Sequence, residues 1–142
     1  MTPVDKVKLI VLAAVSAAGA GITQALGGWD GALELLILLM GADYLLGITV
    51  ALCFHASPKT QGGRLSSAAG LRGIAKKGAM LLLVLLAAAL DRAMGTEAAR
   101  LGVIYFLSGN EGISILENIG LMGVPLPPGL REAFEALHRK GG

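Results

Sequence analysis

The sequence predicts an all-α, polytopic membrane protein with three to four transmembrane helices and a short C-terminal amphipathic helix. Three observations lead to this fold class. Of the 142 residues, 54% are hydrophobic and only 15% are charged, against roughly 25% charged in a soluble domain. The apolar residues gather in runs long enough to cross a bilayer. A basic segment separates two of these runs, as cytoplasmic loops of membrane proteins do.

The first apolar run, residues 9–26, contains no charged residue and is long enough for one span. Ala13, Ala17 and Gly21 share one face at a spacing of four, which suits close helix contact in lipid. A cleaved signal peptide is an alternative, because a basic start, an apolar middle and small residues near the end fit that pattern. A helix that lies on the membrane surface is a third interpretation.

The second run, residues 31–54, follows a short turn in which Trp29 is placed as an interfacial anchor. Asp43 falls near the middle of this predicted span. Because a carboxylate at mid-bilayer costs roughly 2.5 to 3.5 kcal/mol on insertion scales, Asp43 should face other helices or water. It is therefore a candidate site residue, and the alternative is that it only pairs with a basic residue for assembly.

The segment that follows is predicted to be a cytoplasmic loop, residues 55–73, with the third span at 74–90. Ser66 or Ser67 is placed to cap a helix at the end of this loop. Basic residues of the loop and of the start of the span should lie at the cytoplasmic membrane surface, and the two consecutive lysines should extend their side chains back to it. These residues are Lys59, Arg64, Arg72, Lys76 and Lys77.

The fourth apolar run, residues 101–122, is the least apolar and carries a polar stripe. At 100° per residue its polar side chains fall within an arc of about 120°. They are Asn110, Glu111, Ser114, Glu117 and Asn118. Such a stripe is too polar to face lipid, so these residues are candidates for lining a pore or for assembly. The alternative is an amphipathic helix that lies flat at the interface.

The C-terminal tail, residues 125–142, begins with a proline-rich stretch that ends the preceding helix and then predicts a short surface helix with a basic end. With four spans and the basic loop inside, ten of the twelve lysines and arginines lie on the cytoplasmic side, and only Arg92 and Arg100 lie outside. This distribution predicts that both termini are cytoplasmic. If the first run does not cross, only the N-terminus changes side.

Several motifs in series resemble one known family. The string LSSAAGLRGIAKKG precedes an apolar run that ends in LDRAMG, and SGNEGISILENIGLMGVPLPPGL follows. Together, over roughly residues 41–137, they are similar to the phage holin family that includes the clostridial toxin-secretion holins. The resemblance implies a small membrane protein of the bacterial inner membrane that forms homo-oligomers and opens lesions. It further implies a cell-wall endolysin as functional partner, and an inhibitory antiholin as an additional one.

Other function classes have little support in the sequence. The formal net charge of +2 gives no bulk basicity for nucleic acid, and a single cysteine, Cys53, excludes an internal disulfide. His55 and His138 lack ligand spacing, so neither a metal site nor a cofactor is expected, and no catalytic motif is present. Two rivals remain: a small proton-coupled multidrug exporter, with Asp43 or Glu111 as titrating carboxylate, and a structural subunit whose polar stripe binds a partner helix.

Overall fold

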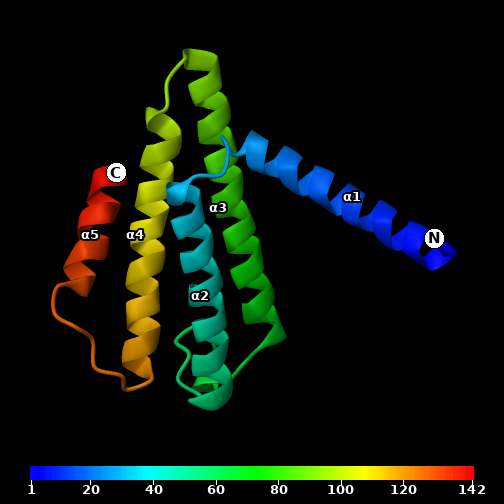
Figure 1. Ribbon diagram of the computed structural model, residues 1–142. Coiled ribbons are helices and arrows are strands. Elements are labelled where there is room, and N and C mark those ends of the chain that lie inside the picture. Colours follow the sequence, from blue (N-terminus) through cyan, green and yellow to red (C-terminus); the bar gives the residue numbers. More distant parts are fainter.

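The computed structural model describes all 142 residues and consists of helices joined by short connections, with no strand (Figure 1). Five α-helices and one short 3₁₀ helix follow one another along the chain. Their bounds are α1 Pro3–Ala25, α2 Gly31–Cys53, η1 Gln61–Gly63, α3 Ser67–Met94, α4 Ala98–Leu121 and α5 Leu130–Gly141. The predicted all-α fold class is confirmed, and α1, α2 and α3 are long and apolar enough to cross a membrane.

Local sequence explains where the helices begin and end. Thr2 and Asp5 form a reciprocal capping box at the start of α1, and the Asp30 side chain accepts a hydrogen bond of 2.9 Å from the Leu33 N–H at the start of α2. Ser66, one of the two serines predicted to cap, caps α3. That helix ends at Gly95, whose φ of 69° is the left-handed conformation that glycine adopts easily.

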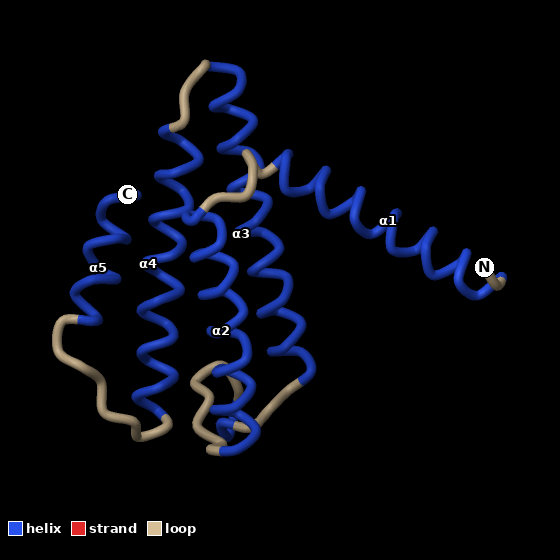
Figure 2. Tube along the Cα trace, viewed as in Figure 1, coloured by secondary structure: helices blue, strands red, loops and turns tan.

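Helices α2, α3 and α4 form an antiparallel bundle. The connections after α2 and after α4 therefore lie at one end, which we call the loop end, and the turn between α3 and α4 lies at the other (Figure 2). Helix α4 contacts α2, α3 and α5, and α5 folds back along it (Figure 1). The apolar core occupies the half of the bundle away from the loop end. It contains Leu26, Leu33, Leu36, Met40, Met80, Val84, Ile104 and Leu107.

Helix α1 lies outside this bundle and buries none of its residues. It leaves the α2–α4 bundle obliquely and meets α3 only near its own C-terminal end (Figure 1). An apolar helix without a protein neighbour is stable in lipid, because its backbone hydrogen bonds are internal to the helix. The fold is therefore a three-helix bundle with one helix on each side of it, α1 and α5.

Three details of the helices were not expected from the sequence. Helix α3 begins at Ser67, so the helix expected after a cap at Ser66 or Ser67 and the span expected from residue 74 form one continuous helix that includes Arg72. Helix α4 has the expected position but is not among the helices apolar enough to cross a membrane by composition. The predicted surface helix at the C-terminus packs along α4 rather than extending away from the bundle.

Candidate functional site: a buried polar network beside a cavity

The central feature of the loop-end half of the bundle is an ammonium group shared by two carboxylates. Lys77 Nζ on α3 lies 2.9 Å from Asp43 Oδ2 on α2 and 2.6 Å from Glu111 Oε2 on α4. The side chains of Asp43 and Glu111 are only 6% and 3% exposed, and that of Lys77 is 15% exposed. One lysine thus joins all three helices of the bundle. The expectation that it extends to the membrane surface is replaced by this pairing.

An amide completes the network. Asn118, one helical heptad after Glu111 on α4, donates from Nδ2 to Asp43 Oδ1 at 3.2 Å. Both oxygens of Asp43 therefore accept a hydrogen bond, one from each neighbouring helix. Buried charges persist only when they are paired and hydrogen-bonded, since desolvation is costly. The pairing that was one interpretation of Asp43 is thus present, and its partner is Lys77.

Helical periodicity explains why Asp43 points inward. The buried residues of α2 include Leu36, Met40 and Asp43, which recur at intervals of four and three and so share one face. Farther from the loop end, the same face of α2 contributes to the apolar core. Asp43 is therefore the polar continuation of a core stripe, and its burial follows from the stripe alone, while its partners depend on how α3 and α4 pack.

The predicted polar stripe of α4 is divided by the packing. Glu111 and Asn118 are buried in the bundle, Ser114 is half-buried, and Asn110 and Glu117 are exposed. The Glu117 carboxylate lies 4.0 Å from Arg131 of α5. The structure therefore brings Glu111, Asn118 and Asp43 together, and leaves two polar residues at the outer edge of α4.

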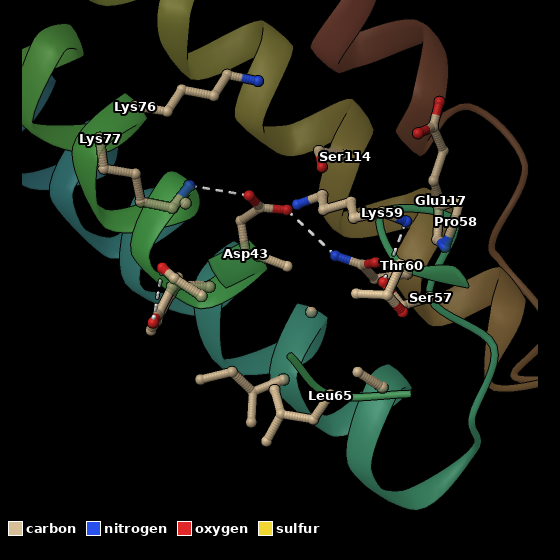
Figure 3. A pocket seen from close by; sticks show the side chains of 18 of the residues that line it. Asp43, Ser57, Pro58, Lys59, Thr60, Leu65, Lys76, Lys77, Ser114 and Glu117 are labelled. Atoms are coloured by element: carbon tan, nitrogen blue, oxygen red, sulfur yellow. Dashed lines mark hydrogen bonds and ion pairs between the residues drawn. The ribbon is translucent and has the colours of Figure 1, made fainter. Parts of the chain in front are cut away.

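A cavity of about 280 Å³ opens beside this network, between α2, α3 and α4 and next to the loop that connects α2 to α3 (Figure 3). The Tyr44 hydroxyl donates to the Gly70 carbonyl oxygen at 3.2 Å and joins α2 to α3 at its edge. Three of the five basic residues assigned to the cytoplasmic surface line this cavity, namely Lys59, Lys76 and Lys77. Arg64 and Arg72 are exposed and do not line it.

A second cluster, which the sequence did not predict, holds the turn between α1 and α2. Arg100 donates from Nε to the Leu26 carbonyl oxygen at 2.6 Å and from Nη2 to the Gly28 carbonyl oxygen at 2.9 Å, and its Nη1 lies 2.6 Å from Asp30 Oδ2. The hydrogen bond from Arg100 lowers the pKa of the Asp30 carboxyl. Arg92 adds a bond of 3.2 Å to the Ala25 carbonyl oxygen. Both arginines predicted to lie outside thus fix the point from which α1 departs.

Asp91 caps α4 from the preceding helix. Its carboxylate accepts hydrogen bonds from Thr96 Oγ1 at 2.6 Å, Ala99 N at 3.1 Å and Arg100 N at 2.8 Å. The N-cap residue of α4, Glu97, makes no side-chain cap bond. A carboxylate near free N–H groups at a helix start is favourable. The available sequence signal was an acidic residue, Asp91, shortly before the turn at Gly95. Because Asp91 lies inside α3, this signal did not identify it as the residue that caps α4.

Helix α5 fits closely against α4 because glycines line the contact. A Cβ atom at Gly109 would collide with the backbone of His138, and one at Gly112 would collide with the Phe134 ring. The rings of His138 and Phe106 stack at 4.1 Å between centroids. Close helix approach through small residues is typical of helix pairs in membranes.

Comparisons with known proteins place the chain among phage-related membrane proteins. Residues 20–139 match the family model described as the bacteriophage holin family. A relative from Clostridium perfringens, an uncharacterized 14.9 kDa protein in the nagH 3′ region, is 40% identical over 124 residues, which cover 86% of this chain and 88% of the relative. An uncharacterized protein of Listeria innocua is 36% identical over 125 residues, covering 87% and 84% of the two chains. No solved structure matches this chain.

Proposed function

Because the chain belongs to the bacteriophage holin family, we propose that it self-associates in the bacterial cytoplasmic membrane and opens lesions. These lesions release a cell-wall endolysin or another protein during phage lysis or toxin secretion. The endolysin is the functional partner, and an inhibitory antiholin is a further one. The family, the three apolar helices and the polar surface described next support this proposal.

The observation that carries the proposal is the charged outer face of α5. This helix lies along α4, so its charges flank the bundle instead of extending beyond its end (Figure 1). The exposed charged residues of α5 are Arg131, Glu132, Arg139 and Lys140. At roughly 2.5 to 3.5 kcal/mol for each charge in the bilayer centre, this face is incompatible with hydrocarbon. In a membrane it must therefore face water or a partner.

The opposite side of the molecule has the composition of a lipid contact. Helix α3 exposes a series of large apolar side chains, and α1 is apolar and unburied over most of its length. The exposed apolar residues of α3 are Leu71, Ile74, Leu82, Leu83, Leu86, Leu90 and Met94. A ring of protomers with α1 and α3 toward lipid and α4 and α5 toward the centre encloses water. Asn110, Ser114 and Glu117 then lie near the aqueous wall.

The buried network has an assembly role in this proposal. Asp43, Lys77, Glu111 and Asn118 hold α2, α3 and α4 at fixed positions, so that α4 presents α5 outward. Two buried carboxyl groups share one ammonium, and an amide completes their hydrogen bonds in a low-dielectric setting. Such a network is stable only while all its members are in place.

The proposed orientation places the loop end in the cytoplasm. The loop between α2 and α3 and the connection between α4 and α5 lie at the same end of the bundle (Figure 2). The two arginines assigned to the outer side, Arg92 and Arg100, lie toward the opposite end. An excess of lysine and arginine on the cytoplasmic side is the general rule for short loops. In the four-span arrangement the N-terminus is then cytoplasmic, whereas α5 runs from the loop end back along α4, so that Gly141 lies beside Gly102.

The test is co-expression with a cytoplasmic endolysin in bacteria, scored as culture lysis, with membrane fractionation to confirm protein levels. The proposal predicts lysis that depends on both proteins and loss of membrane potential when the membrane protein is expressed alone. Replacement of Glu132 and Arg139 by leucine should abolish lysis while leaving membrane insertion intact, because it removes two of the four exposed charges of this face. Proton-driven export of organic cations without any lysis would favour the exporter instead.

A further inference from the structure

The cavity at the loop end carries two cations that have no carboxylate partner. Lys59 comes from the loop after α2 and Lys76 from the third turn of α3, and neither forms an ion pair. Figure 3 shows Lys76 at the upper left of the view and Lys59 on the other side of Asp43, with the Lys59 side chain directed toward Asp43. We propose that this cavity binds the anionic phosphodiester headgroup of a membrane phospholipid, with Lys59 and Lys76 as its charged ligands.

The carboxylates that line the same cavity are already engaged. Asp43 and Glu111 share Lys77, at 2.9 and 2.6 Å, and Glu117 lies 4.0 Å from Arg131 of α5. Lys76, and Lys59, whose charge interacts with the Asp43 carboxylate without forming an ion pair, are therefore the lining cations that remain available to an anion. A phosphodiester carries one negative charge and accepts several hydrogen bonds, which matches two ammonium groups with free donors.

Hydroxyl groups supply further donors. Ser57 Oγ accepts a hydrogen bond of 3.3 Å from the Lys59 N–H, and Ser66 Oγ accepts one of 3.3 Å from the Ala69 N–H. Because each oxygen acts as an acceptor in these bonds, its own hydroxyl hydrogen stays free to donate. Both serines line the cavity, and Ser57 is buried. The phosphate oxygens thus have ammonium and hydroxyl donors in one place.

The position of the cavity favours a lipid over a free anion. Apolar residues Ile48, Leu65 and Ile113 line it beside the polar ones. These side chains offer contacts to the apolar part of a lipid while the headgroup stays near the basic loop. Basic pockets between transmembrane helices on the cytoplasmic side bind anionic lipid headgroups in this way.

The binding test uses the full-length protein in a neutral detergent, with lipid adducts counted by native mass spectrometry. The probes are phosphatidylglycerol, phosphatidylcholine and inorganic phosphate. We expect selective retention of phosphatidylglycerol, and a loss of affinity of about five-fold for each lysine removed, or about thirty-fold for Lys59→Gln with Lys76→Gln. The matched control is Arg64→Gln with Arg72→Gln, which removes the same charge outside the cavity.

A further variant and the comparison among the three probes decide whether the cavity binds an anionic lipid, any lipid or free phosphate. Lys59→Arg with Lys76→Arg should retain the lipid, which separates lost binding from lost folding. If the Lys59→Gln, Lys76→Gln variant and the Arg64→Gln, Arg72→Gln control lose lipid affinity equally, the attraction is a non-specific surface effect. That result would overturn the proposed site. Equal retention of phosphatidylcholine, or binding of phosphate as tight as that of the lipid, would also overturn it. Because the measurement needs no lysis, its failure is distinguishable from failure of the proposed function.

Discussion

Replacement of Lys77 by methionine removes the single ammonium that joins Asp43 to Glu111. The methionine side chain has similar length, so the change deletes charge and hydrogen bonds with little change in volume. Two carboxylates that are 6% and 3% exposed then remain without a cation. Breaking a buried ion pair by removing one partner typically costs about 3 to 5 kcal/mol. The expected effect is therefore a rise in the unfolding equilibrium constant of roughly 10² to 10⁴.

The assay is reversible unfolding of the purified protein in mixed micelles, followed by helix content. Lys76→Met is the matched control, since the neighbouring lysine is exposed and forms no ion pair, and it should change stability by less than about 0.5 kcal/mol. A triple variant with Lys77→Met, Asp43→Leu and Glu111→Leu should recover most of the loss, because no uncompensated charge remains. Equal stability of the two lysine variants would refute the shared-ammonium network as the element that holds the bundle.

Three further predictions concern the contact between α4 and α5, the ion pair of Asp30 with Arg100, and the orientation in the membrane. Gly112→Leu should displace α5, because any Cβ there meets the Phe134 ring, and trypsin should then cut within α5; Gly120→Leu, in open space, should not have this effect. Arg100 lowers the pKa of the Asp30 carboxyl, so wild type should be more stable than Asp30→Asn by an amount that is constant above pH about 4. This advantage should disappear at lower pH as the carboxyl protonates. An advantage of wild type that persists in acid would contradict the bond between Asp30 and Arg100. A cysteine at residue 64 should be labelled only from the cytoplasm, and labelling from outside intact cells would reverse the proposed orientation.

Much of the helical framework could be predicted from the sequence because hydrophobic runs and capping residues are local signals. The second helix, predicted at residues 31–54, is observed at Gly31–Cys53. The cap at Ser66 was recognised as the start of a helix, but the sequence did not show that this helix continues without a break into the span expected from residue 74. Length and hydropathy reveal the apolar part of a helix, and they do not reveal how far it extends beyond the membrane.

The partners of the polar residues could not be predicted, because they depend on packing between helices distant in sequence. Lys77 is 34 residues from both Asp43 and Glu111, and a lysine near the end of an apolar run is usually expected to reach the surface. The polar residues of α4 lie along one helical face, as the periodicity predicts. The packing of α5 determines the surroundings of the residues at the two edges of that face. Gly102 and Gly109, seven residues apart on α4, were the available signal that another helix lies close there.

The central claim is that the face formed by α4 and α5 meets water while α3 meets lipid. The direct measurement is cysteine accessibility in a Cys53→Ser background, with single cysteines at residues 132 and 139 on α5 and at residues 82 and 86 on α3. A membrane-impermeant thiol reagent, applied to cells that are undergoing lysis, should react with the α5 cysteines and not with the α3 cysteines. Protection of both α5 positions in permeabilised membranes, together with reaction at the α3 positions, would contradict the claim.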